Sequence, residues 1–186
     1  LTDDALLDPR SGNLLLAVYH PSPGKTGGSS ATIGLAWVEL STGRFEAGSF
    51  PLAALSDQIA RLEPAEILVR EDDSTLTRDD FEKWALTRRP SWQFGFEESQ
   101  RILHEHFGVL DLSGMGWDLQ PDASVNATSL QDLLAISAAG AALAYLQETQ
   151  KTSLTHIQQL VPSRLSRILE IDSATRRSLE LTQTIR

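Results

Sequence analysis

Three consecutive acidic residues, Glu71, Asp72 and Asp73, follow a short apolar run and have the side chains that bind divalent metal ions. Metal-dependent nucleases use such carboxylates, which converge on two metal ions about 4 Å apart. A run of carboxylates at the end of a strand is more often a solvated loop. Two interpretations are therefore open, a nuclease centre and a solvated turn, and the second is favoured.

A glycine-rich stretch, PGKTGG, contains Gly24, Lys25 and Thr26 and has part of the pattern of a phosphate-binding loop. The P-loop needs Gly-x-x-x-x-Gly-Lys-Ser/Thr between a strand and a helix. The first glycine would fall at position 19, which is Tyr19, and the stretch is followed by a strand. Because no helix N-terminus would then point at a phosphate, the spacing favours a hairpin loop over a nucleotide site.

The histidines show no spacing that suits catalysis or metal binding. His104 and His106 lie two residues apart in LHEHF, which on a helix places their side chains about 200° apart. Two histidines that share a metal ion on one helix are spaced i, i+4, as in HExxH. The pair is therefore predicted to be exposed on a helix, and no Ser-His-Asp set has a local signature.

The elements that carry these residues follow from the hydrophobic pattern. Short apolar or alternating runs predict three strands that form an antiparallel meander, over 13–20, 32–40 and 44–50. The third alternates, and it predicts a half-exposed strand with Phe45 and Ala47 inward and Arg44 and Glu46 outward. Further helices are predicted over 52–62, 77–88, 97–107 and 130–146, and further strands over 65–69 and 91–96.

The order of these elements predicts an α/β fold, a mixed β-sheet flanked by helices with an RNase H-like layout. That layout raises the nuclease hypothesis again, since such enzymes normally take a central carboxylate from the first strand. The first strand here, LLLAVY, offers none. In the longest helix, Gly140 at the centre of AAGAA predicts close packing against another element, which would offset the low helix propensity of glycine. Residues 147–164 are predicted to be a bendable linker before a last helix.

Composition and charge exclude some functions. The 186 residues are 41% hydrophobic, enough for a core, and contain no cysteine for a disulfide or thiolate metal site. The net charge is −9, and the 22 acidic and 11 basic residues of 1–160 would repel a phosphate backbone. The acidic N-terminus lacks the basic n-region expected of a signal peptide, so none is predicted here. These features predict a cytoplasmic protein with no membrane contact, whose main body is not a general nucleic-acid binder.

The segment 97–107 carries a different candidate, a surface for a protein partner. Its periodicity places Arg101 and Glu105 outward and leaves Ile102 available for contacts. An ordinary surface helix is the alternative. Trp92, just before this segment, suits either the core or a surface anchor, and the core is favoured.

Several stretches together resemble the MutS family of bacterial DNA mismatch-recognition ATPases. The last eighteen residues, LEIDSATRRSLELTQTIR, resemble the start of the core domain of that family. GLAWVELSTGRFEAG and AAGAALAYLQETQKTSLTHI resemble the hairpin and closing helix of its connector domain. The loop 20–31 and the segment 118–129 look longer than usual, and Ser178 replaces a usual asparagine. The resemblance covers nearly the whole chain.

The resemblance implies a connector domain over 1–150, followed by a linker and the truncated start of the core domain over 151–186. It implies a relay between domains rather than an enzyme, with no cofactor in this chain. ATP, magnesium, mismatched DNA and a second MutS subunit would be bound by other parts of the parent protein. A MutL partner would dock on the connector, at a surface that position alone places at Arg101, Ile102 and Glu105.

Overall fold

A computed structural model describes residues 13–21, 31–74, 76, 82–119 and 127–164. Its centre is a six-stranded mixed sheet with the strand order β5-β4-β1-β2-β3-β6. The strands are β1 (Leu14–Tyr19), β2 (Thr32–Glu39), β3 (Arg44–Pro51), β4 (Glu66–Arg70), β5 (Ala85–Arg89) and β6 (Val161–Pro162). The helices are η1 (Leu52–Ala54), α2 (Leu55–Leu62), η3 (Ser91–Phe94), α3 (Phe96–Phe107), η4 (Ser113–Met115) and α4 (Ala127–Thr149).

The predicted antiparallel meander is confirmed, and so is the α/β class with its mixed sheet and flanking helices. Strand β1 pairs antiparallel with β2, and β2 pairs antiparallel with β3. Strand β4 then pairs in parallel with β1, and β5 pairs in parallel with β4, each after a crossover. The predicted last helix and the PGKTGG stretch lie outside the described residues.

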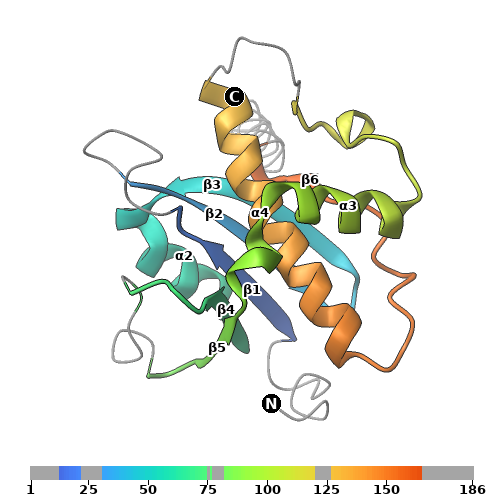
Figure 1. The fold of residues 1–186 in the computed structure, drawn as a ribbon. Helices are drawn as coiled ribbons and strands as arrows, with labels where there is room; N and C mark the ends of the chain where they lie inside the picture. Colours follow the sequence, from blue (N-terminus) through green and yellow to red (C-terminus); the bar gives the residue numbers. More distant parts are fainter. Residues whose placement is uncertain (1–12, 22–30, 75, 77–81, 120–126, 165–186) are drawn as a thin grey trace, which may run out of the picture.

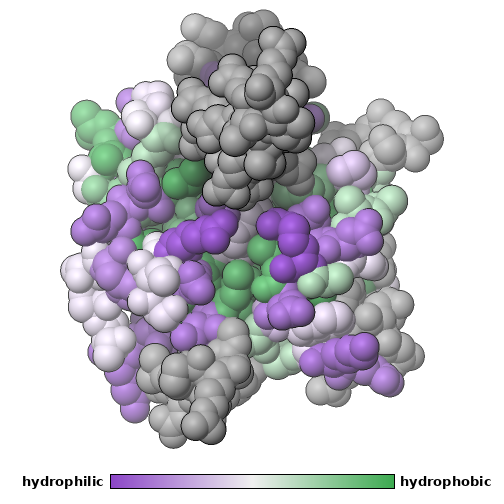
Figure 2. All heavy atoms as spheres, turned by 180° about the vertical axis from the view of Figure 1, so that it is seen from behind, coloured by the Kyte–Doolittle hydropathy of each residue, from purple (hydrophilic) through white to green (hydrophobic). Residues whose placement is uncertain are grey.

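The sheet is covered on both faces. Helix α4 lies across the front of the sheet with α3 beside it (Figure 1), and together they enclose one apolar cluster. Helix α2 closes a second cluster on the opposite face. Seen from behind, hydrophobic atoms reach the surface near the middle of the molecule, among hydrophilic ones (Figure 2).

Strand β3 is not half-exposed as predicted, because its second face also packs. Glu46 is only 6% exposed. Its carboxylate accepts a hydrogen bond from Trp37 Nε1 at 2.8 Å and one from Arg44 Nη2 at 3.0 Å. Two donors therefore satisfy a carboxylate that the alternating pattern had placed in solvent.

Two predictions for the region between β4 and α3 are wrong. Residues 85–89 form strand β5 rather than the end of a helix, and 91–96 contains the 3₁₀ turn η3 rather than a strand. The pairing that fixes β5 is with β4, about twenty residues earlier, and local periodicity does not show it. Pro90 then ends the strand, since proline fixes φ and offers no N–H to the ladder.

Helix α4 forms as predicted, three residues longer at each end, and it packs against Ser99 of α3 at Gly140. A Cβ added at position 140 would lie 2.2 Å from the Cβ of Ser99, so only glycine allows this approach. By length and composition alone, Thr128–Thr149 is apolar enough to cross a membrane, but 78% of its most apolar window is buried inside the protein. Its burial against the sheet and α3 explains that composition.

Residues 157–164, predicted to belong to a bendable linker, are packed against this body, whereas most of 151–156 is exposed. Ile157 is 2% exposed and Leu160 is fully buried. Strand β6 follows and pairs in parallel with β3 through Val161 and Pro162. Burial and pairing thus hold residues 157–164 to the module, which the polar composition of the segment did not indicate.

Candidate functional site

The acidic residues considered for a nuclease lie where β1 and β4 end, beside Arg70. The Arg70 guanidinium donates to Asp72 Oδ1 at 2.8 Å and to the carbonyl oxygen of His20 at 3.1 Å, and it lies 5.8 Å from the ring centre of Tyr19. Its hydrogen bonds lower the pKa of Asp72 to about 2. Asp72 is therefore held by an arginine of the preceding strand.

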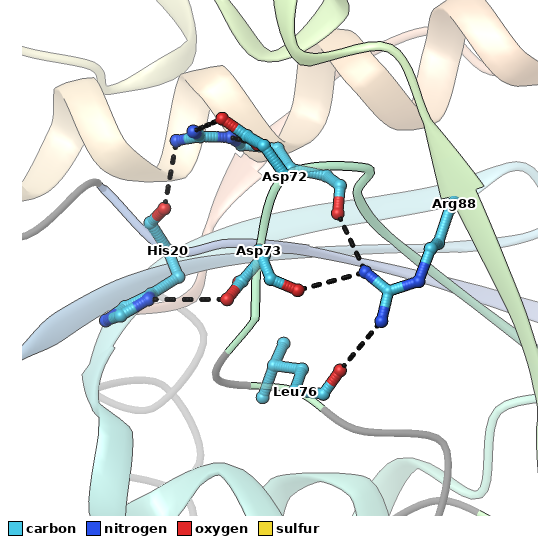
Figure 3. A network of polar contacts seen from close by, with 6 residues as sticks. His20, Asp72, Asp73, Leu76 and Arg88 are labelled. Atoms are coloured by element: carbon cyan, nitrogen blue, oxygen red, sulfur yellow. Dashed lines mark hydrogen bonds and ion pairs between the residues drawn. The ribbon is translucent and has the colours of Figure 1, made fainter.

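Asp73 is turned in a different direction and is almost fully buried. Its carboxylate lies 3.8 Å from Nδ1 of His20. Arg88 reaches across from β5 and donates to the carbonyl oxygens of Asp73, Arg70 and Leu76, at 2.9, 3.3 and 3.1 Å (Figure 3). These contacts fix the turn after β4.

The two aspartates thus stabilise a turn and do not converge. Among the residues that the structure describes, no three His, Cys, Asp or Glu side chains are grouped so that they could hold a metal ion. Nothing in the geometry favours a nuclease. The alternative prediction of a solvated turn is confirmed for the exposed Glu71 and Asp72 and is wrong for Asp73, which is buried.

A buried polar group that the sequence did not indicate joins α4 to the sheet. Glu66 is fully buried, and its Oε1 accepts hydrogen bonds from Tyr145 Oη at 2.6 Å and Thr87 Oγ1 at 2.5 Å. Burial and the contact with Glu66 raise the pKa of Tyr145. The three residues come from α4, β4 and β5, so only the fold brings them together.

Residues 156–164, called here the exit segment, are held by ring N–H groups that donate to main-chain carbonyl oxygens. His106 Nε2 contacts the carbonyl oxygen of Ile157 at 2.8 Å, and His156 Nε2 contacts that of Leu40 at 2.7 Å. Since a carbonyl oxygen only accepts, each Nε2 must carry the proton. Trp117 Nε1 donates to the carbonyl oxygen of Leu160 at 2.9 Å. His106 and His156 therefore stabilise the position of the exit segment through these hydrogen bonds.

An ion pair closes the end of the exit segment. Arg164 pairs with Asp132 of α4, donates to the carbonyl oxygen of Gly116 at 2.6 Å, and lies 5.7 Å from the ring centre of Trp117. Asp132 is 2% exposed, and its other oxygen accepts from the backbone N–H of Asp118 at 2.8 Å. One buried carboxylate thus ties the last described residue to α4 and to the loop before it.

The predicted docking residues lie on α3, but they do not share one face. Arg101 and Glu105 are exposed, and Arg101 donates to Glu98 at 2.7 Å and to Glu105 at 2.8 Å. The hydrogen bonds from Arg101 lower the pKa of Glu98. Ile102 is only 7% exposed and packs in the cluster beneath α4. A turn of about 100° per residue directs its side chain inward, so Ile102 is withdrawn from the surface.

A groove of about 550 Å³ adjoins the C-terminal end of α3. Its lining includes Phe107 and Ile157, three glutamines and three hydroxyl side chains. The described residues along it carry no carboxylate, ammonium or guanidinium group.

Comparison with known proteins gives a family model and a curated relative. A family model described as MutS domain II matches residues 13–158. The chain is 42% identical over 198 aligned positions to the DNA mismatch repair protein MutS of Rhodopirellula baltica. That alignment covers 100% of the chain and 21% of the relative, so the chain spans about a fifth of the length of the curated relative that it matches.

Proposed function

The chain belongs to the MutS family and corresponds to MutS domain II. We propose that it is the connector module of a longer DNA mismatch repair protein. The observation that carries the proposal is the packed exit segment, which fastens the end of the module to its central helix. A connector needs such a fixed exit, because a movement at one end must reach the other.

The contacts support a relay that moves as one body. Helix α4 packs on β1, β2 and β3 and also on α3, and the pair of Arg164 with buried Asp132 links the exit to that helix. Asp132 is buried but the Arg164 side chain is 40% exposed, so breaking this pair should cost less than the roughly 3–5 kcal/mol of a fully buried pair. A displacement at residue 164 is therefore transmitted to the sheet rather than absorbed inside the module.

We place the module boundary accordingly. The connector predicted over 1–150 is proposed to include the packed residues up to 164, and the start of the core domain predicted within 151–186 to follow them. The match of the family model to residues 13–158 supports a boundary beyond 150.

We further propose that a MutL protein docks on the outer face of α3, defined as Glu97, Glu98, Arg101 and Glu105. Arg101 and Glu105 were predicted for this role and are exposed. Ile102 is excluded because it is buried. Charges at the rim of an interface mainly steer association and fix its register, and a row of paired charges on a helix can do this.

The other activities that the family implies are assigned to other parts of the longer protein. We propose that ATP with magnesium, mismatched DNA and a second MutS subunit are bound there, and that this chain is not itself an enzyme. The relative is a DNA mismatch repair protein, and we place the protein in the cytoplasm, where bacterial DNA lies.

The docking proposal is tested by reversing one charge on each side of the module. Arg101→Glu in the longer protein should weaken binding to MutL by roughly tenfold, because it breaks the row of paired charges that fixes the register of the interface. Arg61→Glu is the matched control, since Arg61 is also exposed on a helix but belongs to α2 on the opposite face. Equal affinities of both variants and the parent, measured by biolayer interferometry, would reject this face.

A further inference from the structure

Trp92 is exposed, although the sequence favoured a place in the core. Its side chain is 63% exposed, while Gln93 and Phe94, the next two residues of η3, are almost fully buried. The tight turn after Pro90 directs these two inward and the indole outward. A tryptophan left in solvent is unusual, and tryptophan is among the residues most enriched at the energetic centres of protein interfaces.

Hydrogen bonds fix the backbone of Ser91–Phe94, which carries the indole of Trp92. The N–H of Gly95 donates to the carbonyl oxygen of Trp92 at 3.1 Å, and the N–H of Ser91 donates to Glu71 Oε1 at 3.3 Å. The side chain of Gln93 joins Arg89 at 3.0 Å to Glu148 at 2.9 Å. Little conformational freedom would be lost on binding, which favours affinity.

Acidic side chains outnumber basic ones around Trp92. Arg70, Arg89 and Arg101 are each paired with an acidic side chain, namely Asp72, Glu148 and Glu98. Glu71 and Glu97 are exposed, and within the described part of the chain neither forms an ion pair. Arg88 is directed to the carbonyl oxygens of Arg70, Asp73 and Leu76 in the turn after β4. Glu71 and Glu97 therefore leave an excess of negative charge around the indole.

This patch continues the outer face of α3. Glu97, Arg101 and Glu105 are spaced by four residues and form one row along the helix. Glu97 stands at the end of the row that follows η3, five residues after Trp92. A partner that lies along the row therefore reaches the tryptophan.

We propose that Trp92, flanked by Glu71 and Glu97, receives an arginine- or lysine-bearing segment of the protein that docks on the outer face of α3. An indole face attracts a cation more strongly than other aromatic rings do, and two unpaired carboxylates add charge complementarity. The same charges disfavour a nucleic acid. The inference rests on the proposed function and states the chemistry of its partner.

The patch is tested directly with tetra-arginine amide and the full chain labelled with ¹⁵N. We expect the indole N–H signal of Trp92, identified by its loss in Trp92→Phe, to shift at millimolar peptide and to return at high salt. The shift should fall at least severalfold in the double variant Glu71→Gln/Glu97→Gln. An unmoved signal, or an equal shift in the double variant, overturns the inference.

Binding of the longer protein to MutL separates the inference from the proposed function. We expect Trp92→Ala to weaken binding roughly tenfold or more, with an unchanged unfolding midpoint. Leu110→Ala is the control, because Leu110 is 97% exposed and lies beyond α3. If Arg101→Glu weakens binding and Trp92→Ala does not, the inference fails and the docking face stands. If only Trp92→Ala weakens binding, Trp92 contacts the partner but the outer face of α3 does not, and the proposed docking face is rejected.

Discussion

The inner and outer sides of helix α3 differ in what their contacts contribute. On the inner side, Ser99 is fully buried and meets Gly140, and His106 reaches the carbonyl oxygen of Ile157. On the outer side, Arg101 and Glu105 form ion pairs in solvent. The contact of Ser99 is removed from water and that of His106 is partly buried, whereas the outer ion pairs can be exchanged for contacts with water.

Within the twelve residues of α3, one side therefore contributes mainly to the stability of the fold and the other is available for contacts with a partner. Exposed ion pairs typically contribute about 0–1 kcal/mol, so the outer side can change its charges with little effect on the fold. Buried contacts are sensitive to a single methyl group because interiors are close-packed. The inner side therefore fixes where α3 lies, and the outer side is free to be selected for a partner.

Gly140→Ala should show the largest effect, and its sign is informative. Helix propensity alone predicts stabilisation by about 1 kcal/mol. The added Cβ would lie 2.2–2.3 Å from Ser99, including its backbone Cα, and overpacking of this kind costs about 1–3 kcal/mol. We expect net destabilisation in urea unfolding. Gly114→Ala is the control, since nothing lies within 4 Å of its added Cβ, and a stabilised Gly140→Ala variant would show that α3 is not held by this contact.

His106→Phe should show an intermediate effect on the same side. Phenylalanine keeps a planar ring but leaves the carbonyl oxygen of Ile157 without its donor, which costs about 0.5–1.5 kcal/mol. We also expect faster amide hydrogen exchange in the exit segment.

His104→Phe is the matched control for that variant. Nε2 of His104 is buried without a hydrogen-bond partner among the described residues, so its replacement by phenylalanine should be neutral or stabilising. Equal losses in the two variants would mean that ring volume, and not the hydrogen bond to Ile157, holds the exit segment.

The same helix shows how far sequence reasoning reaches. The period of 97–107 predicted α3 itself, and the small residues around Gly140 predicted its close neighbour. Side-chain direction was less secure, because Ile102 adjoins the exposed row and only the position of α4 shows that it is covered. Trp92 was misplaced for the opposite reason, since aromatic residues favour the core and the outward turn of η3 depends on Pro90 and on the buried side chains after it.

The contacts that unite distant segments could not be predicted from local pattern. Tyr145 and Glu66 are 79 positions apart, and Arg164 and Asp132 are 32 apart. No helical or strand period relates such residues. Polar composition even argued against packing of the exit segment, which is held through the main-chain carbonyls of Ile157 and Leu160 as well as through the side chains of His156 and Arg164.

Arg101→Ala should have the smallest effect on stability and a clear effect on one titration. Arg101 holds the pKa of Glu98 below its ordinary value, so the pair stabilises the folded state above the unfolded pKa of Glu98 and loses that contribution as pH falls through the folded pKa. Without Arg101, the pKa of Glu98 should rise toward its ordinary value, while the unfolding midpoint at neutral pH stays unchanged. NMR titration of the carboxyl carbons measures this, with Asp72 as internal control because Arg70, on β4, holds its pKa at about 2. A large loss of stability at neutral pH would mean that the outer side of α3 also maintains the fold, and the division between its two sides would not hold.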